Sequence, residues 1–172
     1  SKDNINKAYN LISTSKVRNE MIVDDVITCI TRKQTPVILT RFKEHAKFLY
    51  DALKGKADHV FLLYGDNSDK ENTEIRGRLK QVPGSESLVL VATGQKIGEG
   101  FDFPRLDVLM LAAPVSFEGR LEQYVGRLNR DYVGKEAVYV YDYIDSHVRY
   151  FDKMYAKRLR TYRKMGFSIW TQ

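Results

Sequence analysis

The sequence predicts an α/β fold, a doubly wound and mainly parallel sheet flanked by helices. Short apolar runs bounded by turn residues recur at 36–40, 60–64, 88–92, 108–112 and 138–141. These runs are nearly continuous in apolar residues and rich in β-branched or aromatic ones, which is typical of strands covered on both faces. Helical patterns separate them, and this alternation favours right-handed crossovers between parallel strands.

The connecting segments show the spacing of amphipathic helices. Apolar residues recur every three or four positions over 42–53, 70–82 and 115–130, so a helix is expected in each range. Ser68 or Asp69 has the side chain needed to cap the start of the second of these helices. Each helix would therefore cover the sheet with one apolar face.

Two more helices are expected at the ends of the chain, over about 18–31 and 146–165. A length of 172 residues fits one domain, and the sequence contains no repeat, low-complexity tract or long linker. We divide this domain into a core of about 34–145 and flanking helices within 16–33 and 146–168.

Composition limits the location and partners of the protein. No apolar run approaches the roughly 18 residues of a membrane span, so no membrane partner is expected. The single cysteine, Cys29, shares helical spacing with Ile22 and Val26, and we expect it to pack in the core. One unpaired cysteine fits a reducing, cytoplasmic location. A start at Ser1 without Met is expected of an excised fragment.

The positive charge is concentrated near the C-terminus. Residues 149–164 carry seven Lys and Arg against one Asp, which accounts for the whole net charge of +6. Lys153, Lys157 and Arg160 lie on one continuous stripe of the predicted helix. Such a row can bind nucleic acid, although a solvated face on a docked helix is an equal alternative. The neighbouring stripe of Val148, Phe151, Tyr155, Leu159 and Tyr162 is expected to face the core.

Two stretches of sequence carry the strongest chemical signal. Residues 92–104 read A-T-x-x-x-x-G-x-G-x-D-x-P, and residues 123–130 read Q-x-x-G-R-x-x-R. Arg127 and Arg130 are spaced to share a helix face, and guanidinium groups bind phosphate oxygens through paired hydrogen bonds. Asp102 adds an acceptor-only carboxylate. A surface ion pair is the alternative interpretation of the arginines.

Polar residues also follow the first two predicted strands. Thr40, Arg41 and Lys43 come at the end of the first, and Gly65 follows the second. Ligands of open α/β sheets bind beyond the carboxyl ends of the strands, so these residues are candidates for phosphate contact. An ordinary loop cation and a simple turn are the alternatives, and His45 is expected to be an ordinary helix residue.

Together these motifs resemble motifs IV, V and VI in the second RecA-like domain of superfamily 2 helicases. The resemblance implies that Arg127 and Arg130 are arginine fingers, oriented by Gln123. It places Gly98, Gly100 and Asp102 with the arginines at an ATP cleft. It further places Thr40, Arg41, Lys43, Gly65 and Thr93 on a nucleic-acid track. Glu99 replaces an arginine common in RNA helicases, so their detailed contacts do not transfer.

Stretches at 39–45, 97–102, 140–145 and 154–163 are similar to the restriction-type branch, which includes type III restriction subunits. The resemblance implies a DNA partner, with RNA as the alternative, and a nuclease domain or subunit as a further partner. A phosphate loop, G-x-x-x-x-G-K-[ST], and an acidic magnesium-binding strand are both missing. ATP with Mg²⁺ would therefore bind mainly to an N-terminal RecA-like domain outside this sequence.

The fragment alone is expected to be catalytically silent, and no metal site of its own is expected. A non-catalytic module that binds nucleic acid or protein is the second hypothesis. A small-molecule α/β enzyme is the third, but the sequence has no nucleophile and base at a recognisable spacing.

Overall fold

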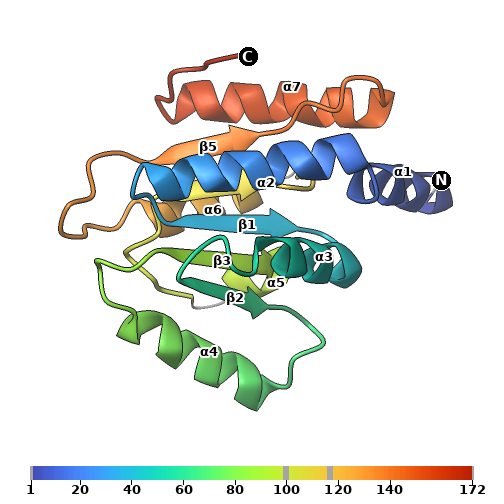
Figure 1. Ribbon diagram of the computed structural model, residues 1–172. Coiled ribbons are helices and arrows are strands. Elements are labelled where there is room, and N and C mark those ends of the chain that lie inside the picture. The colour runs from blue at the N-terminus through green and yellow to red at the C-terminus, as the bar shows by residue number, and fades with distance from the viewer. Residues whose placement is uncertain (1, 99–100, 116–117, 172) are drawn as a thin grey trace.

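Five parallel strands form one sheet in the order β2-β3-β1-β4-β5 in the computed structural model, which describes residues 2–98, 101–115 and 118–171 (Figure 1). The strands are β1 (Pro36–Thr40), β2 (His59–Leu63), β3 (Leu88–Thr93), β4 (Val108–Leu111) and β5 (Tyr139–Asp142). All four neighbouring pairs run parallel. The predicted doubly wound α/β fold is confirmed, with β1 at the centre of the sheet.

Helices cover both faces of this sheet. On one face lie α2 (Lys16–Thr31) and α3 (Lys43–Leu53), which are in front of the strands in Figure 1. On the other lie α4 (Asp69–Gln81), α5 (Gly94–Gly98) and α6 (Glu118–Leu128). The last helix, α7 (Arg149–Lys164), packs beside α6, and α1 (Lys2–Ser13) begins the described chain.

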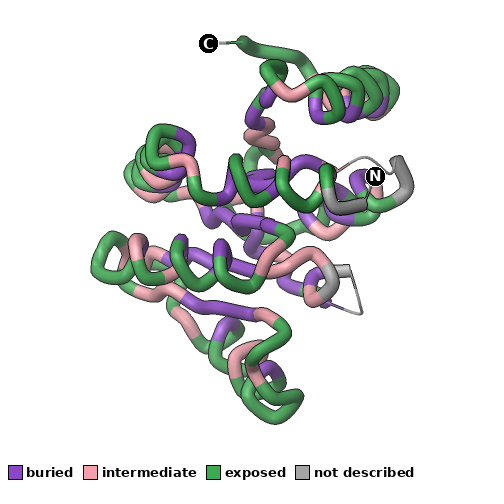
Figure 2. The backbone as a smooth tube through the Cα atoms, turned by 90° about the vertical axis from the view of Figure 1, so that its right-hand side faces the viewer, coloured by how far each residue is buried: buried purple, intermediate pink, exposed green. Residues whose placement is uncertain are grey.

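Successive side chains of each strand point to opposite faces of the sheet, and this divides the core into two layers. Val37 and Leu39 of β1 face the α4–α6 side, whereas Ile38 between them faces α2 and α3. All three are nearly inaccessible to solvent. Figure 2 shows buried residues at the centre of the molecule and exposed residues on the outer sides of the helices. Strands β1, β3 and β4 are almost entirely buried, whereas β5 at the edge is not. This two-sided burial explains why the strands read as continuous apolar runs rather than alternating ones.

Most predicted elements lie within two or three residues of the observed ones. The helix expected over 70–82 begins at Asp69, where Ser68 caps it and Glu71 completes the reciprocal capping box. The helix expected over 115–130 is shorter, because α6 begins at Glu118 and ends at Leu128. Arg130 therefore lies outside the helix, and the prediction that it shares a helix face with Arg127 is wrong.

The first helix, α1, was not predicted. Its Tyr9 and Ile12 are buried with Phe151 and Met154 of α7, so α1 closes an apolar cluster at the carboxyl end of the sheet. No helix in the described part of the chain is long and apolar enough to span a membrane.

Candidate functional site

The candidate site lies at the carboxyl edge of the sheet. Thr40 and Thr93 are the last residues of β1 and β3, and they stand side by side in the parallel register. The chain then continues into α3 on one face and α5 on the other. Because the two connections leave in opposite directions, a crevice for a ligand is expected between these strand ends.

Asp102 and Arg130 form an ion pair at this site. Arg130 Nη1 lies 3.1 Å from Asp102 Oδ1, and both side chains are about half exposed, at 53% and 48%. The structure thus joins the two sequence motifs through one contact, although neither residue lies in a helix or strand. An exposed pair of this kind contributes little to stability, so a phosphate could replace the carboxylate at low cost.

Arg127 occupies the last turn of α6 and is only partly exposed. Its Nε is buried and has no hydrogen-bond partner within the described residues. A buried donor without a partner costs free energy, so an incoming acceptor at this nitrogen would be favourable. Gln123, one turn earlier, is exposed. Gly98 is the last residue of α5 rather than part of an open loop, and Gly100 lies outside the described residues.

Gly94 links the end of β3 to α6 through a close approach. A Cβ built at Gly94 would lie 2.5 Å from Tyr124 Oη, which is too close for any larger residue without movement. Tyr124 is buried and lies in α6 between Gln123 and Val125. The glycine after Thr93 therefore allows the helix that carries Arg127 to pack directly on the strand end.

Thr40 is part of a buried hydrogen-bond chain. Its Oγ1 lies 2.5 Å from His45 Nδ1, and His45 Nε2 lies 2.8 Å from Asn19 Oδ1. The amide of Asn19 donates to the Ser13 carbonyl at 2.9 Å, so its Oδ1 is the acceptor for His45. The hydroxyl of Thr40 consequently donates to a neutral His45. Any contact of the hydroxyl with a phosphate stays a prediction.

The three other predicted track residues near β1 and β2 are exposed. Arg41 stacks on the ring of Tyr9, with 4.3 Å from its guanidinium carbon to the ring centroid. Lys43 pairs with Asp66 at 3.2 Å. A Cβ at Gly65 would meet nothing within 4 Å, so neither a positive φ nor a close approach requires glycine there. Their contacts with nucleic acid are untested.

Helix α7 presents Lys153, Lys157 and Arg160 to solvent, as predicted. The face it buries is rotated from the predicted one: it consists of Phe151, Met154, Arg158, Thr161 and Tyr162. Val148, Tyr155 and Leu159 are only half-buried. The difference arises because one of the seven basic residues belongs to the interior.

That residue is Arg158, which forms a buried paired contact with Asp142 at the end of β5. Its Nε and Nη2 donate to the carboxylate at 2.7 and 2.8 Å, and Nη1 donates to the Val115 carbonyl. The Tyr162 hydroxyl also donates to Asp142, at 2.6 Å. The row of cations on α7 is therefore fixed rigidly to the sheet by a pair that sequence analysis did not identify.

A second buried pair lies on the other side of β5. Arg18 of α2 donates to both carboxylate oxygens of Asp145, at 2.9 and 3.0 Å, and to the Ala112 carbonyl. Both side chains are almost fully buried. Sequence analysis missed this pair because its partners are far apart in the chain.

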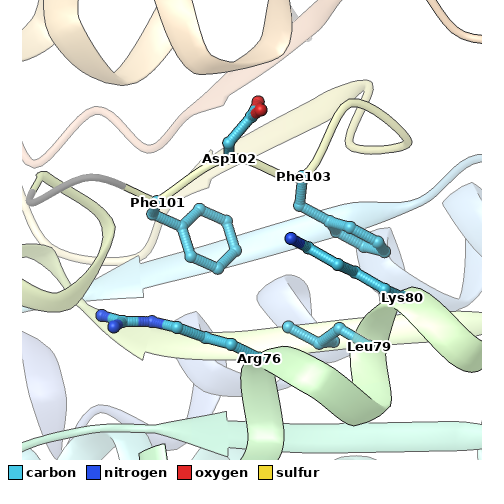
Figure 3. Close-up of a pocket in the computed structure, with 6 residues that line it drawn as sticks. All are labelled: Arg76, Leu79, Lys80, Phe101, Asp102 and Phe103. Carbon is cyan, nitrogen blue, oxygen red and sulfur yellow. The ribbon is translucent and has the colours of Figure 1, made fainter. Parts of the chain in front are cut away.

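A shallow pocket lies next to the candidate site, between α4 and residues 101–103. Figure 3 shows Phe101 and Phe103 pointing toward Lys80 of α4, whereas the carboxylate of Asp102 points away from them. Asp102 also lines the pocket, so the pocket adjoins the Asp102–Arg130 contact although the carboxylate does not point into it. Within the described residues, no group of three or more His, Cys, Asp or Glu is arranged to hold a metal ion.

Comparison with known proteins shows that the sequence is similar to proteins of several viruses. No protein-family model matches the sequence. The chain is 29% identical over 120 residues to the transcript termination protein of Yaba-like disease virus, covering 69% of this chain and 24% of that protein. It is 30% identical over 162 residues to "Putative helicase 161L" of Invertebrate iridescent virus 6, covering 90% and 35%. The chain thus spans about a quarter to a third of these relatives.

Solved structures share the fold. T4 UvsW has a TM-score of 0.74 at 21% identity, covering 94% of this chain and 35% of that chain. S. cerevisiae Dbp5 bound to RNA and ADP BeF3 has a TM-score of 0.61 at 16% identity, covering 87% and 36%. The C-terminal domain of the DEAD-box protein Dbp5, also at TM-score 0.61, is 12% identical, covering 88% and 80%. The chain therefore has the RecA-like α/β fold of these solved structures, and in sequence it is similar to a putative helicase.

Proposed function

We propose that the chain is the second motor domain of an ATP-dependent helicase or translocase and is inactive on its own. The observation that carries this proposal is the 3.1 Å contact between Asp102 and Arg130, which brings motifs V and VI together at an exposed edge of a RecA-like sheet. In this proposal Arg130 and Arg127 stabilise charge on the transferred phosphoryl group. Gln123 orients them, and Gly98, Gly100 and Asp102 border the nucleotide.

ATP and Mg²⁺ would be held mainly by an N-terminal RecA-like domain of the same parent chain, since this sequence has no phosphate loop. Dbp5, which shares this fold, is bound to RNA and ADP BeF3 in its structure, and this supports the proposal that the parent protein binds nucleotide and nucleic acid. The residues at the site fit phosphate: Arg130 is accessible, and Arg127 has a buried donor without a partner in the described part.

Nucleic acid would run along the end of the sheet past Arg41, Lys43, Gly65 and Thr93, and along the basic row of α7. DNA is the proposed track, with RNA as the alternative. We also propose the restriction-type branch, a nuclease partner and a cytoplasmic location; these rest on the sequence resemblance and on the single buried cysteine, Cys29.

The test is ATP hydrolysis by the parent protein. Arg130→Ala should lower kcat by about 10³-fold or more, with little change in ATP affinity. Arg130→Lys should not rescue, because an ammonium lacks the planar fork. The matched control is Arg163→Ala, which removes an exposed arginine of α7. A wild-type kcat in Arg130→Ala would refute the role of Arg130 as an arginine finger. ATP hydrolysis by the isolated chain would refute the proposal that the chain is inactive on its own.

A further inference from the structure

Lys135 lies in a turn that returns the chain to the end of α6. Gly134 has φ of +83°, and the Lys135 amide donates to the Tyr132 carbonyl at 3.0 Å. The turn is therefore closed by the left-handed conformation that glycine adopts at little cost. Lys135 is partly buried, whereas Asp131, Val133 and Glu136 around it are exposed.

The ammonium group of Lys135 contacts three backbone carbonyls. Its Nζ donates to Pro104 O and Arg130 O, both at 2.9 Å, and to Leu128 O. An ammonium has three donors, so this group uses all of them. The Leu128 carbonyl ends α6, where carbonyls have no partner inside the helix and attract cations.

These three carbonyls belong to the two motifs of the candidate site. Pro104 follows Asp102 in one, and Leu128 and Arg130 belong to the other. Because α6 stops at Leu128, the helix itself does not set the backbone of Arg130. The side-chain contact between Arg130 and Asp102 is half exposed and contributes little to holding either loop. The side chain of Lys135 joins the backbones of the two motifs.

We propose that Lys135 is a positioning residue that fixes the backbone of Arg130 relative to Asp102. This inference rests on the proposed role of Arg130 in hydrolysis. All three donors of Lys135 go to backbone carbonyls, which leaves none for a nucleotide or a phosphate. Burial lowers the pKa of its ammonium, and Asp107 and Asp131 act in the opposite direction. The site therefore holds a partly buried charge at the point where the two loops meet.

Lys135→Met keeps an unbranched side chain, one atom shorter, and removes its three donors. In the parent protein, kcat should fall by about 10- to 100-fold, since a small misplacement of a catalytic group can cost about 10² in rate. The KM for ATP and the affinity for nucleic acid should change by less than about 2-fold, because the donors of Lys135 are used by backbone carbonyls and leave none for either ligand. Lys135→Arg, which keeps charge and donors, should recover part of the lost rate.

Lys56→Met is the matched control. Lys56 also follows a glycine of positive φ, Gly55 at +80°, in a turn after a helix, but it is exposed. Hydrogen exchange of the chain gives a readout that does not depend on hydrolysis. In Lys135→Met, amides of 103–106 and 129–131 should exchange faster together, whereas Lys56→Met should leave both segments unchanged.

The outcomes separate the two hypotheses. Loss of kcat in both Arg130→Ala and Lys135→Met, with faster exchange in both segments, supports the inference. If Arg130→Ala is inactive but Lys135→Met has wild-type kcat, the inference is overturned and the proposed function stands. If Arg130→Ala is fully active, the role of Arg130 fails. The exchange data then decide alone whether Lys135 joins the loops, and unchanged exchange in folded Lys135→Met refutes it.

Discussion

Protonation of His45 should destabilise the protein in mild acid. His45 is 3% exposed, and it bridges Thr40 and Asn19 as a neutral ring. Burial, followed by the nearby charge of Arg18, lowers the pKa of His45 from an ordinary 6.5 to about 4. A protonated ring would have to donate from both nitrogens, so the Thr40 hydroxyl would have to turn and accept, and burial and the charge of Arg18 both disfavour the protonated form.

The size of the effect follows from this pKa difference. An ordinary pKa of 6.5 and a folded value of about 4 correspond to about 3 kcal/mol. The unfolded chain binds the proton more readily, so this stability is fully present above 6.5 and is lost as pH falls toward about 4. Between about pH 7 and about pH 5 the loss should be about 2 kcal/mol.

Urea unfolding of the chain at both pH values measures this loss. His45→Gln keeps a donor and an acceptor but does not titrate. From about pH 7 to about pH 5, the free energy of unfolding of this variant should therefore fall by about 2 kcal/mol less than that of the wild type. The exposed His147→Gln is the control and should follow the wild type. Equal pH dependence of His45→Gln and the wild type would refute the neutral, buried histidine.

Two further predictions concern the packing of α6 and the charge of α7. Gly94→Ala should cost about 1–3 kcal/mol in urea unfolding, and adding Tyr124→Phe should recover part of this cost by removing the 2.5 Å contact; additive effects in this double-mutant cycle would contradict the close approach. In the parent protein, changing three exposed cations of α7 to Gln should weaken nucleic-acid binding and flatten its log–log salt slope by about 2–3. The three are Lys153, Lys157 and Arg160. The control changes Lys33, Lys56 and Lys70 to Gln, because these lysines are exposed elsewhere on the protein. Equal salt slopes in the two triple variants would show that α7 does not bind nucleic acid and only covers the core.

Periodicity predicted the sheet well because its central strands, β1, β3 and β4, are buried on both faces. A strand such as β1, with all five residues buried, leaves a run of apolar residues that no loop would carry. The cap at Ser68 was also predictable, since the side chain that satisfies the helix end is local in sequence. The helix α1 was missed although Ile5, Tyr9 and Ile12 have helical spacing, because the residues of α7 on which it packs are far away in the chain.

Contacts between distant residues were not predictable from one sequence. Arg158 carries a charge that is typical of surface residues, and its contact with Asp142 explains why it lies on the buried face of α7. The end of α6 was misplaced for a similar reason. The sequence 126–130 continues without Pro, whereas the carbonyl at Leu128 is satisfied by Lys135 from the following turn. The roles of the predicted site residues remain predictions.

The two buried charge pairs beside β5 constrain how this sequence can change over time. Breaking a buried pair by losing one partner costs about 3–5 kcal/mol, whereas replacing both with apolar residues of similar volume is often neutral. Arg18 with Asp145 and Arg158 with Asp142 each fit that description. Either pair can therefore be lost in evolution only when both partners are replaced together. The two residues of each pair should covary among homologous sequences.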